Sequence, residues 1–153
     1  MEKVKQTIQL DMASLLDWKP AKGKVFRTEA DVKKEIRCLL DQHGFFWWNV
    51  HGSAYAQSGI SDIHAIRQGV YMVIEGKKFP NRPTMLQKGF LQSITAEKGL
   101  AFVVDERRLG WFAVFLQAFD AAQASAAKDE TPKSEDGAAM LNAMKILQED
   151  FVS

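Results

Sequence analysis

The residues of this chain that could do chemistry together are an aspartate, a glutamate and a lysine. Asp62 lies at the start of the apolar stretch SDIHAIR, and Glu75 and Lys77 lie near the end of a second, VYMVIEGKK. Because side chains alternate along a strand, Glu75 and Lys77 would share one face, and a hairpin would bring Asp62 close to Glu75. Two carboxylates at a sheet edge suit Mg²⁺ or Mn²⁺, and a nearby lysine can orient a water or stabilise charge on a phosphate.

Each of these residues also has a plainer explanation. An aspartate after Gly-Ile-Ser is a common turn residue, and a Glu-x-Lys strand often carries an exposed ion pair. The two stretches are mostly apolar, however, which predicts central strands, where a charge is costly unless it is paired or bound to a metal. His43, His51 and His64 lack metal-ligand spacing, which disfavours a zinc hydrolase.

Capping signals and apolar spacing predict the elements that must position these residues. Thr28 with Asp31, and Thr84 with Gln87, have the capping-box spacing that begins a helix. A tight hairpin turn is expected at Gln68-Gly69. The order helix, three strands, helix, strand, helix predicts an α/β fold with a small mixed sheet. The expected helices span 28–44, 84–99 and 111–124, and the expected strands span 45–50, 61–67, 70–78 and 100–104.

Composition limits the class of protein. The 153 residues are 46% hydrophobic and 25% charged, with a net charge of +1, which excludes a disordered chain or a collagen-like fibre. No apolar run approaches the roughly 18 residues of a membrane span, and Gln and Asp interrupt the start, unlike a secretory signal. Cys38 alone forms neither an internal disulfide nor a thiolate zinc cluster. We therefore expect a cytoplasmic protein of a bacterium or a virus-infected cell.

Charge and composition shift along the chain. Residues 127–153 carry three basic and six acidic side chains, which leaves seventeen basic and thirteen acidic ones on 1–126. An excess of basic side chains fits a surface that binds phosphates, although most charged segments are simply exposed to solvent. The expected division is an N-terminal extension (1–27, with a possible helix at 8–16), a domain (28–126), a polar linker (127–137) and a C-terminal helix (138–153).

Three motifs in this order resemble the VRR-NUC (virus-type replication-repair nuclease) family of the PD-(D/E)xK nuclease superfamily. They are Gly59-x-Ser61-Asp62, Glu75-x-Lys77, and Pro83-Thr84 followed by Gln87. Upstream, TEADVKKEIRCLLDQHG is similar to the family's first helix, and Asn49 lies where the family often has an asparagine. The resemblance covers about residues 28–105 and implies a PD-(D/E)xK-like core, a small central mixed β-sheet flanked by helices in the order α-β-β-β-α-β-α.

The resemblance also implies roles for individual residues. Asp62 and Glu75 would bind the divalent metal, and Glu29 would complete the acidic cluster from the first helix. Lys77 would position or activate the attacking water, and Gln87 would support the site from the second helix.

One competing residue and two departures from the family pattern bear on this assignment. Glu35 also lies on the first helix, but the family places its acid one turn before the first apolar position, Val32, which favours Glu29. Ser61 replaces the proline of the superfamily name and is not itself a ligand. Gly76 stands where a bulky apolar residue is expected; a phosphate backbone could approach there, or the site could be weaker.

The resulting expectation is a Mg²⁺- or Mn²⁺-dependent, structure-selective deoxyribonuclease of bacterial or phage type that cuts branched DNA, a Holliday junction or a flap. A homodimer could form through the apolar stripes of 111–119 or of the C-terminal helix, although both stripes also suit a core. Aromatic residues at 45–48 could stack on unpaired bases or fill the core. Flanking phosphates would meet Lys33, Lys34, Lys78, Arg82 and Lys88.

Two other interpretations stay open at this stage. The chain could be a catalytically weak or inactive DNA-binding or assembly module of the same fold, with its chemistry compromised at Gly76. It could also be an unrelated α/β hydrolase of a small phosphate ester.

Overall fold

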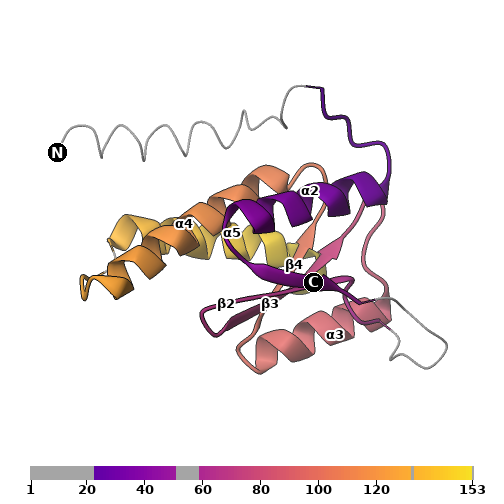
Figure 1. The fold of residues 1–153 in the computed structure, drawn as a ribbon. Helices are drawn as coiled ribbons and strands as arrows, with labels where there is room; N and C mark the ends of the chain where they lie inside the picture. Colours follow the sequence, from indigo (N-terminus) through magenta and orange to yellow (C-terminus); the bar gives the residue numbers. More distant parts are fainter. Residues whose placement is uncertain (1–22, 51–58, 132, 153) are drawn as a thin grey trace.

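Four strands form a central sheet that carries helices on both faces (Figure 1). The computed structural model describes residues 23–50, 59–131 and 133–152, so the helix expected at 8–16 lies outside the described residues. The predicted α/β class and order of elements are confirmed, and the C-terminal helix expected at 138–153 follows as a longer helix that begins at Ser134. The elements are α2 (Glu29–Gln42), β1 (Phe46–Asn49), β2 (Ile63–Arg67), β3 (Val70–Gly76), α3 (Met85–Ala96), β4 (Leu100–Val104), α4 (Leu109–Ala127) and α5 (Ser134–Val152).

The sheet has the strand order β1-β2-β3-β4, so the apolar strands β2 and β3 are central, as their composition predicts. Neighbouring strands β1, β2 and β3 are antiparallel, whereas β4 runs parallel to β3, and α3 makes the crossover between them. Gln68 and Gly69 join Arg67 to Val70 with φ angles of 50° and 80°, the left-handed pair that a two-residue hairpin requires.

Both predicted capping boxes are present. Thr28 Oγ1 accepts a hydrogen bond from the backbone N–H of Asp31, and Asp31 accepts one in return from the N–H of Thr28. Thr84 and Gln87 make the same reciprocal pair at the start of α3. Caps of this kind typically contribute about 0.5–2 kcal/mol each and determine where a helix begins.

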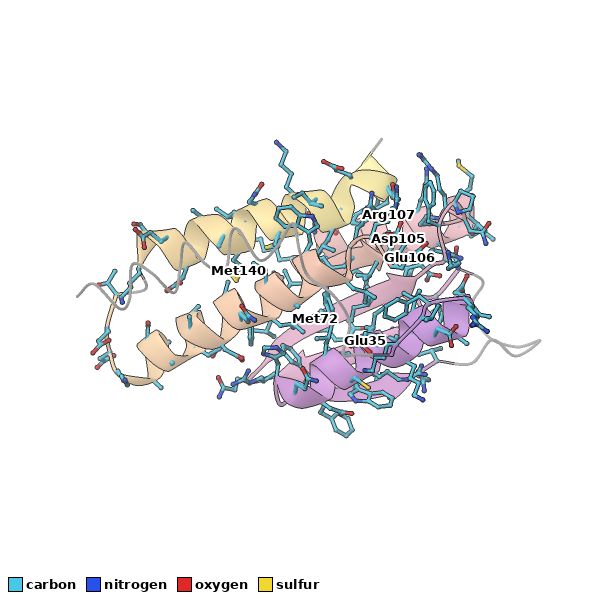
Figure 2. The ribbon with its side chains drawn as sticks, turned by 90° about the horizontal axis from the view of Figure 1, so that it is seen from above. Glu35, Met72, Asp105, Glu106, Arg107 and Met140 are labelled. Atoms are coloured by element: carbon cyan, nitrogen blue, oxygen red, sulfur yellow. The ribbon has the colours of Figure 1, made fainter. Side chains whose placement is uncertain are left out.

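Each face of the sheet packs against its own helices. Helices α2 and α4 and the middle of α5 cover one face, where Val32, Ile36 and Leu40 meet Met72 and Ile74 of β3. Helix α3 covers the opposite face, where its Leu91 contacts a smaller cluster of Val73, Ala101, Val103 and Phe151. Since Phe151 belongs to the end of α5, that helix contributes to both cores. Figure 2 shows α4 and α5 running side by side.

The C-terminal region differs from the sequence-based expectation. The predicted linker at 127–137 is shorter in the structure, because α4 runs to Ala127 and α5 begins at Ser134. Glu135 and Asp136 lie in the first turn of α5, where acidic side chains stabilise a helix. Ala143 and Leu147 of α5 are fully buried in the larger core. The helix is therefore part of the domain. The apolar stripe of 111–119 is mostly buried in the subunit, whereas the stripe of α5 is only partly buried, with Leu141 exposed.

None of the helices formed by the described residues is both long enough and apolar enough to cross a lipid bilayer.

Candidate metal centre

Three carboxylates converge at one end of the sheet. Glu29 is the first residue of α2, Asp62 directly precedes β2, and Glu75 lies next to the end of β3. One oxygen from each lies within 4.8 Å of the others. The pairing of Ile63 with Ile74 across the hairpin brings Asp62 beside Glu75, and the cap at the start of α2 sets the position of Glu29. The structure thus brings together the three residues predicted as metal ligands.

Glu75 is fully buried, and its two oxygens have different surroundings. Its Oε1 accepts a hydrogen bond from Gln87 Nε2 at 2.8 Å and lies 3.3 Å from Lys77 Nζ. Its Oε2 is buried and has no hydrogen-bond partner among the described residues. Burial raises the pKa of the Glu75 carboxyl from its ordinary 4.5 to about 7, and the charge of Asp62 adds to this rise. A buried carboxylate oxygen without a donor is costly, and a bound cation would offset this cost.

The donor set fits a hard divalent cation. All three groups are carboxylates, the ligands that Mg²⁺ and Mn²⁺ prefer, and Glu75 carries a buried oxygen with no hydrogen-bond donor among the described residues. Glu29 and Asp62 are partly exposed, so the site opens toward solvent on one side. Waters and substrate oxygens could complete the coordination from that side.

Lys33 also belongs to this cluster. Its ammonium lies 2.7 Å from Glu29 Oε1 and forms a second ion pair with Asp62. We expected Lys33 to contact DNA phosphates and did not predict that it would pair with the acidic residues. The i, i+4 spacing of Glu29 and Lys33, which places both side chains on one helix face, would have predicted their ion pair.

The turn that carries Asp62 is held by His64, a residue considered above only as a zinc ligand. His64 Nε2 donates to the backbone carbonyl of Ser61 at 2.9 Å, and Nδ1 lies 2.5 Å from Tyr71 Oη. Burial lowers the pKa of His64, so the neutral ring donates at Nε2 and accepts at Nδ1. His64 thereby holds the backbone one residue before Asp62.

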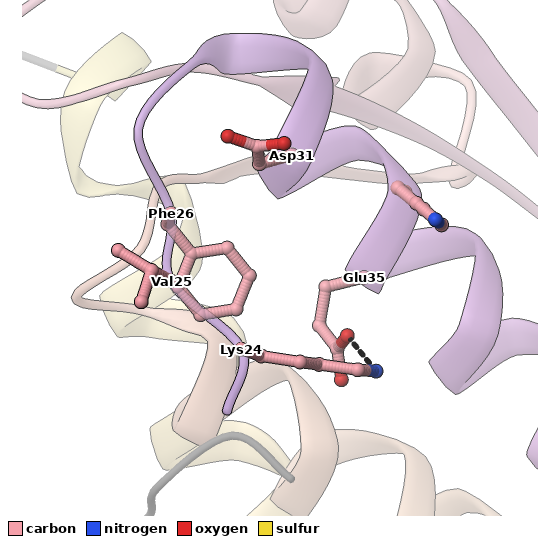
Figure 3. A pocket seen from close by; sticks show the side chains of 6 residues that line it. Lys24, Val25, Phe26, Asp31 and Glu35 are labelled. Atoms are coloured by element: carbon pink, nitrogen blue, oxygen red, sulfur yellow. Dashed lines mark hydrogen bonds and ion pairs between the residues drawn. The ribbon is translucent and has the colours of Figure 1, made fainter. Parts of the chain in front are cut away.

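Glu35, the competing acid on α2, lies outside the cluster. It is buried and pairs at 2.5 Å with Lys24, within a pocket formed by residues 24–26 and the start of α2 (Figure 3). Of the two acids, the geometry therefore places Glu29 at the site. Asn49 lies on the surface, and its Oδ1 accepts a long hydrogen bond of 3.4 Å from Arg37.

The five basic residues predicted to meet DNA differ in their surroundings. Lys78 Nζ forms an ion pair with Glu106 Oε1 at 2.7 Å. Glu106 lies with Asp105 and Arg107 in the turn that follows β4 (Figure 2). Lys33 is engaged by the acidic cluster. The other three (Lys34, Arg82 and Lys88) are exposed or half-buried.

Neither the known protein-family models nor the curated proteins include a match to this chain. The nuclease assignment therefore remains a prediction from the motifs and the geometry of the site.

Proposed function

We propose that this chain is a divalent-metal-dependent nuclease that hydrolyses phosphodiester bonds in DNA. The observation that carries the proposal is the convergence of Glu29, Asp62 and Glu75, with a buried, unpartnered oxygen on Glu75 and with Lys77 beside that residue. A bound Mg²⁺ or Mn²⁺ supplies the positive charge that stabilises the additional negative charge on the phosphate during hydrolysis. The carboxylates of Glu29, Asp62 and Glu75 would hold such an ion.

Two further residues of the chain would contribute to the reaction. Lys77 is mostly buried beside Glu75, and in the proposed mechanism its ammonium orients the attacking water or meets the charged phosphate. In the proposed mechanism Gln87 is a positioning residue, because its amide donates to Glu75 Oε1 and so orients the carboxylate.

Contacts with the DNA would be made mainly to its backbone. Lys34, Arg82 and Lys88 are the predicted basic residues that the acidic cluster and Glu106 do not engage. Phosphate contacts of this kind carry no sequence information and weaken steeply with salt. Phe46 is 71% exposed and Trp48 is 36% exposed on β1, so both could stack on unpaired bases.

A branched substrate, either a Holliday junction or a flap, is the class that the family resemblance implies. Cutting two opposing strands of a junction would require two sites, and hence a homodimer. Most of the apolar residues of 111–119 are buried within the subunit, whereas Leu141 of α5 is 67% exposed and remains available to a partner.

Replacing Asp62 by Asn tests the proposal. We expect cleavage of a labelled junction or flap with Mg²⁺ or Mn²⁺ to fall by about 10²-fold or more, while DNA binding survives. Glu29→Gln should behave similarly, whereas Glu35→Gln, on the same helix but outside the cluster, should retain cleavage wherever it folds.

The two alternatives give different results in the same assay. Binding without cleavage by the unmutated chain, with either metal, would indicate a DNA-binding or assembly module. Inhibition by mononucleotides but not by excess junction DNA would indicate a hydrolase of small phosphate esters.

A further inference from the structure

Lys33 occupies the space between two of the three carboxylates. Its ammonium pairs with both Glu29 and Asp62, and its side chain is only 21% exposed. Burial lowers the pKa of Lys33, but the hydrogen bonds to Asp62 and Glu29 outweigh this effect and hold the pKa above its ordinary value. The cluster therefore already contains one positive charge that the chain itself supplies.

Gly76 explains how the lysine reaches this position. A Cβ atom at residue 76 would lie 2.7 Å from Lys33 Cγ and 3.4 Å from its Cε, so the lysine stem crosses the end of β3 where a side chain is missing. Neither of the two explanations raised from the sequence for Gly76 involved a side chain of α2. Glycine inside a strand is unfavourable, and close approach of another group is a common reason for it. Here that group is the stem of Lys33.

We propose that Lys33 is the counter-cation of the metal-free site and that a divalent cation must displace its ammonium in order to bind. This inference rests on the proposed function, since it requires that Glu29 and Asp62 are metal ligands. An ion such as Mg²⁺ bound to these carboxylates would lie about 2.0–2.1 Å from their oxygens, close to where the ammonium now sits. Two positive centres so close together repel strongly in a partly buried site.

The Lys33 ammonium can leave the site, and its presence there affects metal affinity. The lysine stem is long and flexible, and the ammonium is close enough to solvent to swing outward. Metal binding must break two ion pairs, so Lys33 lowers the metal affinity of the site. The released ammonium would then be free to meet a DNA phosphate, which couples the arrival of the metal to a DNA contact.

The test is calorimetric titration of the 153-residue chain with Mn²⁺. Lys33→Met keeps most of the stem and removes the charge, and we expect it to bind Mn²⁺ about tenfold more tightly than the unmutated chain. Lys145→Met, which removes an exposed positive charge on α5, should bind within about twofold of the unmutated chain.

Gly76→Ala gives a second measurement that keeps the lysine. The added methyl group would push the stem out of its path, so this variant should also bind Mn²⁺ more tightly. In a Lys33→Met background the same change should add little, because the competing charge is already gone. Without metal, Lys33→Met should unfold at a lower temperature, and Mn²⁺ should raise that temperature more than in the unmutated chain.

The outcomes separate the two proposals. Mn²⁺ binding by the unmutated chain with equal or weaker binding by Lys33→Met and Gly76→Ala would overturn the role of Lys33 and leave the metal centre standing. No Mn²⁺ binding by the unmutated chain or by either variant would overturn both.

Discussion

Gln87 links the first turn of α3 to the buried carboxylate of Glu75 through the two ends of one amide group. Its Oε1 accepts the backbone N–H of Thr84 at 2.9 Å, and its Nε2 donates to Glu75 Oε1 at 2.8 Å. Because the cap requires the oxygen, the nitrogen must face the strand. The helix cap and the support of Glu75, which the sequence offered as separate explanations for this residue, are therefore both present.

Gln87→Glu separates these two roles. Glutamate keeps the capping box but loses the donor to Glu75 and places a second negative charge beside it. We expect the pKa of Glu75 to rise further, so that half-maximal Mn²⁺ binding moves to higher pH. Gln87→Ala is the companion variant, which should lose about 1–3 kcal/mol of stability through the cap and the hydrogen bond. An unchanged pH midpoint in Gln87→Glu would show that this side chain does not act on Glu75.

The raised pKa of Glu75 predicts how the stability of the metal-free protein depends on pH. Since the pKa is about 7 in the folded chain against an ordinary 4.5, the folded state keeps a proton that the unfolded state has lost between these values. Stability should fall by about 3 kcal/mol as pH rises through this window and level off above it. Urea unfolding in the presence of a chelator measures this, and Glu75→Gln should remove that part of the pH dependence.

Metal binding should show the opposite trend. A divalent cation binds ionised carboxylates, so Mn²⁺ affinity should increase as pH rises toward about 7 and change little above it. Titration calorimetry at several pH values measures this increase. An affinity that does not vary across this window would mean that the ion does not bind Glu75.

The parts of the fold that were predictable from sequence depend on local signals. The capping boxes at Thr28 and Thr84 and the hairpin turn at Gln68-Gly69 each lie within four residues of chain. The hairpin then brings Asp62 close to Glu75, because strand register follows directly from the turn.

The features that were missed depend on contacts between distant segments. Lys33 lies at the acidic cluster only because α2 crosses the end of β3, and Gly76 leaves room for its stem. Lys78 was expected to be available to DNA, but the turn after β4 brings Glu106 to it from 28 residues away. The Lys33–Glu29 pair follows from local i, i+4 spacing, but no local pattern encodes the pairs of Lys33 with Asp62 and of Lys78 with Glu106, since these depend on how whole elements pack.

Gly59 is expected to be intolerant of substitution for reasons of space and backbone conformation. Its φ angle is +83°, and an added Cβ would lie 2.6 Å from the backbone carbonyl carbon of Leu86 in the first turn of α3. We expect Gly59→Ala to cost about 2–4 kcal/mol and to move α3, with Gln87, away from Glu75. Gly69→Ala is the matched control, because Gly69 has a similar φ angle of +80° with no atom within 4 Å.

The control should cost only about 1–2 kcal/mol, and it should leave Mn²⁺ affinity unchanged. Thermal unfolding and metal titration of the two variants provide the comparison. Equal losses of stability would show that the contact with Leu86 contributes nothing.

The burial of Leu147 predicts that α5 stabilises a single subunit rather than a dimer interface. Leu147 of α5 is completely buried in the larger core, so Leu147→Ala should reduce the free energy of unfolding by about 2–5 kcal/mol. Leu141, on the same helix, is 67% exposed, and Leu141→Ala should change stability by no more than about 0.5 kcal/mol. Urea unfolding at several protein concentrations distinguishes the two roles. If the loss in Leu147→Ala depended on protein concentration, this residue would be acting between subunits, because only association makes stability depend on concentration.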